Sequence, residues 1–304
     1  MPVGLRIQVD NSPRLRYPSM KMESVLEAKR LTKTFKKFTA VSDASFALEK
    51  GEILGLLGVN GAGKTSIIQM LLGILTPTAG EVRYFGKPLL KNRGVLERIN
   101  FSSTYTNLPW NLSVKECLTF SSYLYRIENR KQRIAEIAKI FEIEKLMSSL
   151  VRDLSSGQIT RVNLAKAFLN KPEILLLDEP TASLDPESAQ YIRDFILREQ
   201  KQRELSILFT SHNMHEVEEV CDRIVFLQDG KIIADDTPMA LARSVDISRV
   251  ILLIKGKYET CSVPQKEIAQ FLQGLAAKGI EYDEIEIKTP TLEDYFLKIS
   301  KRNQ

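Results

Sequence analysis

Gly58-Val-Asn-Gly-Ala-Gly63-Lys64-Thr65 is the stretch that decides the fold, because it matches the glycine-rich pattern GxxxxGK[ST]. It follows Ile53-Leu-Gly-Leu-Leu57, an uninterrupted apolar run that is typical of a parallel strand buried on both faces. Residues 64–75 continue as a predicted helix. A buried strand, a glycine loop and a helix, with strands and helices alternating further along the chain, predict an α/β fold with a mainly parallel sheet.

The glycine loop has the chemistry of a site for a triphosphate. A triphosphate requires several backbone N–H donors at close range, and glycine lets the chain approach without a side-chain clash. The helix that follows adds the partial positive charge of its N-terminus. Lys64 is expected to neutralise the β- and γ-phosphates, and the hydroxyl of Thr65 to bind Mg²⁺. The residues predicted to bind the nucleotide here are Gly58, Asn60, Gly61, Ala62, Gly63, Lys64, Thr65 and Ser66.

A second apolar run, Ile174-Leu-Leu-Leu177, ends in the acidic pair Asp178-Glu179. A carboxylate that leaves a buried strand beside a phosphate loop can hold Mg²⁺ through the water shell of the ion, and we expect Asp178 to do so. Glu179 is placed to polarise the attacking water as a general base. Many strands end in an acidic residue that has no such role, so the pair needs support from elsewhere in the chain.

That support comes from Leu154-Ser-Ser-Gly-Gln158, which begins a predicted helix over residues 155–170 and ends 20 residues before Asp178. It resembles the LSGGQ signature of the ABC ATPases, with Ser156 in place of the first glycine. The resemblance continues without a gap through the residues that follow, and it includes the Thr-Ser-His at 210–212. From residue 25 to residue 243 the chain resembles one complete ABC nucleotide-binding domain. Such a domain is a P-loop NTPase core with an antiparallel β part and a helical subdomain, here expected at about 113–170.

The resemblance implies an ATP site that two subunits share. Phe35 matches the aromatic residue that stacks on adenine in this family, and Phe38 is an alternative. Ser155, Gly157 and Gln158 would cap the γ-phosphate of an ATP molecule held by the opposite subunit. A helix N-terminus with a serine hydroxyl is a chemically reasonable place for an anion.

The resemblance also implies the remaining site residues. Asp185 would lie at the seam of the dimer, and His212 would contact the γ-phosphate and hold both the water and Glu179 in place. The predicted catalytic residues are therefore Glu179, His212 and Lys64. His215 lies three residues after His212, but two histidines alone make a poor metal site. The predicted Mg²⁺ ligands are Thr65 and Asp178.

The sequence departs from the family at one place. ABC domains usually carry a glutamine that touches Mg²⁺ and relays to the membrane subunit, and alignment puts Thr104 there, with no glutamine between Gln69 and Gln132. Threonine is shorter by two heavy atoms, so we expect a loosely coordinated Mg²⁺ and slow hydrolysis by the isolated subunit. In the alternative, Ser102, Ser103 and Thr104 form a hydroxyl cluster that serves equally well.

Residues 244–304 are predicted to form a small C-terminal α/β domain. The segment from Thr289 to Leu297 resembles the tail of exporters of drugs, antibiotics, lipids or polysaccharides, in which the permease is a separate chain. Thr291 and Asp294 fit a capping box at the start of the last helix. The predicted elements are strands at 250–254 and 280–287 and helices at 264–278 and 292–299.

Composition limits the partners. The net charge of +5 comes from 43 basic and 38 acidic residues spread along the chain, so no nucleic-acid partner is expected. Since no apolar run approaches the about 20 residues that a membrane-spanning helix needs, another chain must supply any channel. The cysteines Cys117, Cys221 and Cys261 are far apart and predict reduced, mostly buried thiols in the cytosol. Residues 1–24 are expected to be a disordered or non-native tail.

These observations predict an ATP-binding and ATP-hydrolysing subunit of an ABC transporter, with export the expected direction of transport. Two subunits, as a homodimer or heterodimer, would enclose two ATP molecules and drive an integral membrane permease from the cytoplasmic face of the membrane. The alternative is a soluble ABC-type ATPase in translation or DNA repair, although such proteins usually carry two domains or long insertions. A binder without turnover is disfavoured by Lys64, Glu179 and His212.

Leu108-Pro109-Trp110 is an apolar trio that lies just after the position of the missing glutamine. In the family, this segment receives a coupling helix of the permease. The trio therefore predicts a permease contact, with ordinary core packing as the alternative.

Overall fold

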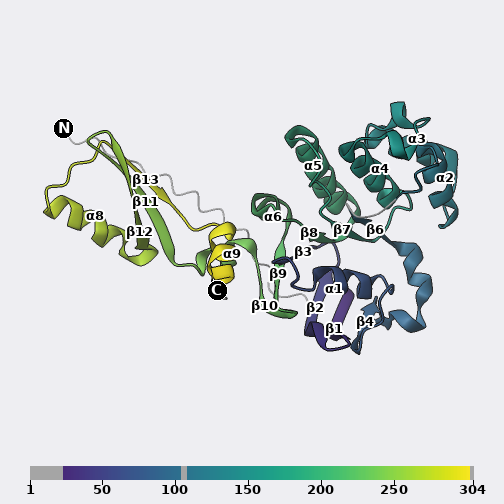
Figure 1. Cartoon of the computed structure of the whole chain (residues 1–304), viewed down its shortest axis with the longest axis horizontal. Helices are drawn as coiled ribbons and strands as arrows, with labels where there is room; N and C mark the ends of the chain where they lie inside the picture. Colours follow the sequence, from purple (N-terminus) through teal and green to yellow (C-terminus); the bar gives the residue numbers. More distant parts are fainter. Residues whose placement is uncertain (1–22, 104–107, 302–304) are drawn as a thin grey trace.

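The structure is a computed structural model that describes residues 23–103 and 108–301, and this part of the chain folds around three β-sheets (Figure 1). In the large sheet β3, β9, β8, β7 and β6 are parallel, and β10 is an antiparallel edge strand. This confirms the mainly parallel α/β core. Its strands, in the order β10-β9-β3-β8-β7-β6, are Lys231–Asp236, Arg223–Gln228, Ile53–Gly58, Ser206–Thr210, Ile174–Asp178 and Ile99–Ser103.

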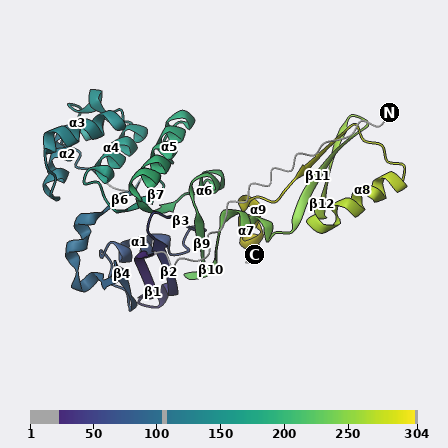
Figure 2. The same ribbon diagram turned by 180° about the vertical axis from the view of Figure 1, so that it is seen from behind.

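The central strands are apolar because both faces of the sheet are covered. Leu175 and Leu177 pack into one hydrophobic core with α4 (Ser156–Phe168) and α5 (Pro186–Arg203). Ile174 and Leu176 point the other way, into a core that they share with α1 (Lys64–Leu71) and with a second, antiparallel sheet. Figures 1 and 2 show α4 and α5 on one side of the sheet and α1 on the other.

The helix after the glycine loop, α1, spans Lys64–Leu71, so the predicted end at residue 75 is wrong. Gly73 ends the helix with a φ of 69°. Its N–H donates to Met70 O at 3.1 Å, and the N–H of Ile74 donates to Gln69 O at 2.9 Å. This pair of bonds is a Schellman motif, which requires a residue that tolerates the left-handed conformation. The glycine at position 73 is therefore the residue of the sequence that ends α1.

The second sheet is antiparallel and contains β1 (Ser24–Phe35). Its core side chains belong to the same cluster as those of α1, so this sheet and α1 are built on the central sheet as one body. The other strands of the order β2-β1-β4-β5 are Phe38–Glu49, Ala79–Tyr84 and Lys87–Pro88, and the short 3₁₀ turns Leu89–Lys91 and Arg93–Arg98 lead to β6.

A helical subdomain projects from the edge of the central sheet that is formed by β6 (Figure 1). It consists of α2 (Val114–Tyr123), α3 (Arg130–Ile140) and α4, with 3₁₀ turns at Glu144–Leu146 and Val151–Asp153. The Arg133 side chain of α3 donates to the carbonyls at the end of α4 and joins the two helices. A buried stripe runs along α3 and includes the residue that follows it: Ile134, Ile137, Ala138 and Phe141.

Strands β9 and β10 form an antiparallel hairpin. Asp229 and Gly230 connect the strands, and both have positive φ, as a two-residue type I′ turn requires. Helix α6 (Met214–Val220) precedes the hairpin and α7 (Pro238–Arg243) follows it.

The third sheet stands apart from the cassette, by which we mean the described residues up to 243 (Figures 1 and 2). Its order is β12-β11-β13, formed by Lys257–Pro264, Ile247–Ile254 and Glu284–Lys288, and α8 (Ile268–Ala277) packs on one face. The predicted helix at 264–278 begins too early, because residue 264 ends β12 and Gln265–Glu267 form a 3₁₀ turn. The predicted strand at 280–287 begins four residues too early.

The last helix, α9 (Leu292–Lys301), returns to the cassette. Leu292 is fully buried in the same core as α4 and α5, and the ring of Phe226 lies 6.0 Å from Tyr295 and 5.7 Å from Phe296. The predicted capping box is present, since Thr291 N–H donates to Asp294 Oδ2 at 3.0 Å and Asp294 N–H to Thr291 Oγ1 at 3.3 Å. Of the predicted unit 244–304, therefore, the part up to β13 stands apart and α9 does not.

Candidate functional site

A cleft of about 370 Å³ lies over the glycine loop. It brings together the loop, the tip of the β1–β2 hairpin and the ends of β7 and β8, which are far apart in the sequence. Parallel strands present their carboxyl ends at one edge, where α/β sheets bind ligands. The residues that line the cleft are Phe35, Phe38, Ala40, Asn60, Gly61, Ala62, Gly63, Lys64, Thr65, Ser66, Asp178, Glu179 and His212.

The glycines of the loop are required by close backbone contacts. A Cβ on Gly63 would lie 2.4 Å from Ala40 O, and the φ of this residue is 105°. A Cβ on Gly58 would lie 2.3 Å from Leu227 O. The loop is thus pressed against β2 and β9, and this packing presents its backbone N–H groups at the start of α1.

The ammonium group of Lys64 lies within the loop. Its Nζ donates to Gly58 O and, at 3.3 Å, to Val59 O. Burial lowers the pKa of Lys64, while the carboxylates of Glu179 and Asp178 act in the opposite direction. A positive charge at the helix N-terminus, with acidic groups nearby, is an arrangement that attracts a phosphate chain and its cation.

Asp178 is held by hydroxyl groups from the strands on either side of β7. Ser103 Oγ, on β6, donates to Asp178 Oδ2 at 3.0 Å, and Thr210 Oγ1, on β8, donates to Oδ1 at 2.7 Å. These donors fix the direction of the carboxylate. Sequence reasoning did not assign this role to Ser103 or Thr210, because the contacts depend on which strands are neighbours. Thr104 lies outside the described residues, so the interpretation of that position stays a prediction.

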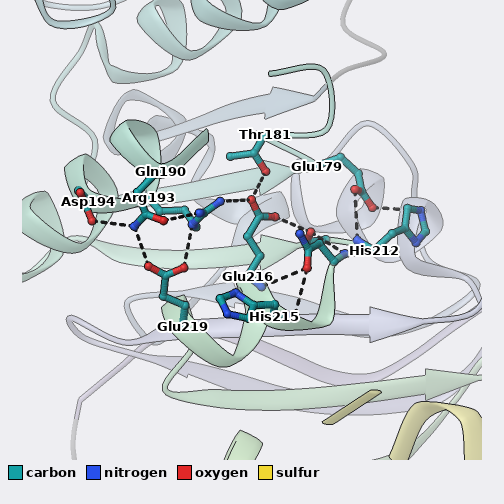
Figure 3. A network of polar contacts seen from close by, with 11 residues as sticks. Glu179, Thr181, Gln190, Arg193, Asp194, His212, His215, Glu216 and Glu219 are labelled. Atoms are coloured by element: carbon teal, nitrogen blue, oxygen red, sulfur yellow. Dashed lines mark hydrogen bonds and ion pairs between the residues drawn. The ribbon is translucent and has the colours of Figure 1, made fainter. Parts of the chain in front are cut away.

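Glu179 and His212 form a pair at the mouth of the cleft (Figure 3). His212 Nε2 lies 3.1 Å from Glu179 Oε1, and the backbone N–H of His212 donates to Oε2 at 3.3 Å. The Glu179 side chain is 12% exposed and that of His212 is 61% exposed. Burial raises the pKa of Glu179, opposed by the charge and the backbone N–H of His212. A carboxylate with a raised pKa that is held by a histidine can accept a proton from water.

The residues of the signature segment 154–158 lie outside this cleft. Ser155 caps α4 by accepting from Gln158 N–H at 3.3 Å, and Gln158 Oε1 accepts from Ser155 N–H at 2.9 Å. Gly157 lies against the 181–185 segment, since a Cβ there would be 3.1 Å from Ser183 O. Asp185 caps α5 by accepting from Ser188, and these bonds lower the pKa of Asp185. Among the described residues that line the cleft, none belongs to this group.

The two candidate aromatic residues are neighbours at the tip of the hairpin. Phe35 and Phe38 are cross-strand partners and are 45% and 64% exposed. Lys33 Nζ lies 5.1 Å from the ring centre of Phe35. Both rings line the cleft, and so does Ala40, which sequence reasoning missed.

No helix within the described residues is long and apolar enough to cross a bilayer. The cysteine thiols are free in this part of the chain, with Cys117 and Cys221 buried and Cys261 half-buried, as the sequence predicts.

The fold and the site define a P-loop ATPase of the cassette type. The family model for "ABC transporter" matches residues 41–182. Similar relatives include the methionine import ATP-binding protein MetN 2 of Enterococcus faecalis, 31% identical over 90% of this chain and 76% of that protein. The Nod factor export ATP-binding protein I of Neorhizobium galegae is 34% identical over 78% of this chain and 69% of that protein.

Solved structures agree. A structure described as the ATP-binding subunit of an ABC transporter has a TM-score of 0.68 and 25% identity, and the match covers 73% of this chain and 93% of that one. The chain therefore belongs to the ABC transporter family. It is an ATP-binding subunit of that family, and its reaction is the hydrolysis of ATP. The prediction of the family and of its fold is confirmed.

Proposed function

We propose that two such subunits, identical or different, close around two ATP molecules and drive a separate integral membrane permease from the cytoplasmic face of the membrane. The observation that carries this proposal is the division of the site. Lys64, Glu179 and His212 line the cleft, whereas Ser155 and Gln158 lie at the start of α4, outside it. One chain therefore offers two incomplete halves, and each half is completed by the opposite half of a second subunit.

In this proposal the cleft holds the nucleotide by contacts of distinct kinds. Phe35 stacks on adenine, with Phe38 beside it, and the loop N–H groups and Lys64 bind the phosphates. Across the dimer, Ser155, Gly157 and Gln158 cap the γ-phosphate, and Asp185 lies at the seam. Mg²⁺ fits this donor set, since the hydroxyl of Thr65 and the carboxylate of Asp178 line one cleft and oxygen ligands suit the ion. When bound, the ion would neutralise charge on the phosphates.

Hydrolysis in this proposal depends on the pair at the mouth of the cleft. Glu179 accepts a proton from the attacking water, and His212 holds the carboxylate and contacts the γ-phosphate. The Glu179 side chain is only 12% exposed, so it is largely shielded from solvent. Its raised pKa makes the carboxylate a stronger base than an exposed glutamate.

The titration of Glu179 tests this role directly. Burial raises the pKa of Glu179, so its midpoint should lie above the value of about 4.3 of an unperturbed glutamate. Because His212 lowers this pKa, the His212→Ala variant should titrate at a still higher pH. The measurement is ¹³C NMR of glutamate-labelled protein, with the signal assigned by its loss in Glu179→Gln. A midpoint at or below the ordinary value would contradict the role of burial.

A surface groove of about 410 Å³ supports the permease partner. It lies between α1 and α2, and its rim carries Ile74, Phe120 and Leu124, which are 71%, 62% and 63% exposed. Large apolar side chains gathered at the surface mark a protein interface. The two large residues of the trio 108–110 differ in exposure: Leu108 is buried at 5%, whereas Trp110 is 67% exposed.

Replacing Trp110 by Ala is expected to weaken permease binding by about 2 kcal/mol, or roughly thirtyfold. Exposed tryptophans that become buried when a partner binds are frequent interface anchors. ATP affinity should not change. The measurement is a pull-down titration with the purified permease subunit. Tyr258→Ala, which removes an aromatic ring that is 69% exposed on β12, is the matched control. Equal binding by wild type and Trp110→Ala would remove Trp110 from the interface.

We propose export as the direction of transport, following the resemblance of the C-terminal segment. The relatives include a Nod factor export protein and a methionine import protein, so the substrate is not assigned. The soluble alternative in translation or DNA repair is not favoured by these relatives. Co-expression with the permease tests the proposal: this chain should sediment with membranes only when the permease is present. Sedimentation with ribosomes, or none with membranes, would overturn it.

For the domain division we propose the predicted limits, with residues 25–243 as the nucleotide-binding domain, a helical subdomain at about 113–170 and a C-terminal unit at 244–304 whose last helix, α9, packs back on the cassette. The antiparallel third sheet and its own small core support a separate unit.

A further inference from the structure

Glu216 is a buried carboxylate for which the proposed mechanism has no use. It lies on α6, about one turn after His212, and is 3% exposed. Its side chain accepts hydrogen bonds from Thr181 Oγ1 at 2.5 Å and from Ser211 Oγ at 2.7 Å (Figure 3). A charged group is rarely buried so completely unless it is paired.

The two donors lie on the two chain segments that carry the pair at the mouth of the cleft. Thr181 follows Glu179 by two residues, after the end of β7, and Ser211 directly precedes His212, after the end of β8. Thr181 donates to Oε1 of Glu216 and Ser211 donates to Oε2. A single carboxylate therefore joins these segments from behind, and on the cleft side they meet through Glu179 and His212.

The charge of Glu216 is balanced from α5. Arg193 Nη1 lies 2.9 Å from Glu216 Oε1, and Arg193 Nε lies 2.9 Å from Glu219 Oε2. Arg193 also donates to Gln190 Oε1 at 2.5 Å. Arg193 is thus paired with two carboxylates, Glu216 and Glu219. Of these two, Glu216 is the one that accepts from Thr181 and Ser211.

We propose that Glu216 is a positioning residue for hydrolysis, which holds the segments of Glu179 and His212 at the spacing that their contact requires. Glu216 does not itself line the cleft, so it acts through those residues and not on the nucleotide. This inference rests on the proposed roles of Glu179 and His212. Small displacements of a catalytic group lower the rate strongly without changing ground-state binding.

The test compares Glu216→Gln with wild type in the full chain. The amide keeps the shape of the side chain, but its NH₂ group is a donor, so only one of the two hydroxyl groups keeps an acceptor. We expect kcat to fall by about tenfold and the affinity for a fluorescent ATP analogue to stay within about twofold. Glu219→Gln is the matched control, because it removes the other carboxylate of Arg193 and touches neither segment. It should retain the wild-type kcat.

A double-mutant cycle separates positioning from general stability. If Glu216 acts through His212, then Glu216→Gln should lower single-turnover hydrolysis by less than about threefold in a His212→Ala background. An equal loss in both backgrounds, or an unchanged kcat, would overturn the inference. If instead Glu179→Gln and His212→Ala leave turnover intact, the proposed mechanism fails first, so the two failures can be told apart.

A second pair of variants covers the case in which Glu216→Gln does not fold. Thr181→Val and Ser211→Ala each remove one donor and keep the ion pair of Arg193 and Glu216. Each should lower kcat by roughly threefold with nucleotide affinity unchanged. Wild-type turnover by both variants would overturn the inference.

Discussion

Replacing Glu179 by Gln is expected to lower ATP turnover by at least about a hundredfold and to leave ATP affinity nearly unchanged. The amide keeps the shape of the side chain and its contact with His212, but it cannot accept a proton from water. Because the nucleotide remains intact, the two proposed halves of the site should stay closed. The variant should therefore accumulate as a dimer in saturating Mg-ATP and not in Mg-ADP.

Light scattering and phosphate release measure the two effects. Glu128→Gln is the control, since Glu128 is an exposed glutamate of the helical subdomain outside the cleft. If the Glu179→Gln variant is monomeric in saturating Mg-ATP, the proposal that two subunits share the ATP site is contradicted, even if turnover is lost. A variant that dimerises but still hydrolyses ATP at the wild-type rate would remove Glu179 as the base.

Replacing Lys64 by Ala is expected to weaken ATP binding by roughly thirtyfold, or about 2 kcal/mol, because a charge-assisted hydrogen bond to phosphate is lost. The loss should be smaller for ADP and absent for AMP, since the group is expected at the β- and γ-phosphates. The melting temperature should not fall. Burial opposes the charge on Lys64, so its removal takes an unfavourable burial out of the folded state.

Isothermal titration with the three nucleotides, alongside a melting curve, measures these effects. Lys139→Ala, at an exposed lysine of α3, should bind all three nucleotides as wild type does. An equal loss for ATP and AMP would place Lys64 at the base or sugar end of the nucleotide instead. A fall of several degrees in melting temperature would show that Lys64 is needed for folding.

The elements whose signal is local could be predicted from the sequence. The glycine loop follows an unbroken apolar strand, and the capping box of Thr291 and Asp294 lies within four residues of chain. The hydroxyl donors around Asp178 could not be predicted in the same way. Ser103 and Thr210 reach Asp178 only because β6 and β8 flank β7, and strand order is set by contacts between segments far apart in the sequence.

The C-terminal part shows where periodicity is insufficient. Strand β12 alternates charged and apolar residues only weakly, and its last residue, Pro264, suits a helix start as well as a strand end. Its partner β11 decides the outcome, through pairs that extend from Ile247 with Pro264 to Ile254 with Lys257. The helix predicted at 292–299 corresponds to α9, but its packing partner could not be deduced. The aromatic residues of α9 pack on Phe226 of the cassette and not on the third sheet, which is nearer in the sequence.

The return of α9 makes the third sheet an insertion in topological terms, and not a tail. The chain leaves after α7, forms β11 to β13 with α8, and comes back to bury Leu292. Arg249 and Lys288 are cross-strand partners, so the outgoing and incoming strands lie side by side. A short turn joining them there would delete the sheet and keep the hydrophobic core whole. Ending the chain at residue 243 would instead remove the two rings of α9 that pack on Phe226.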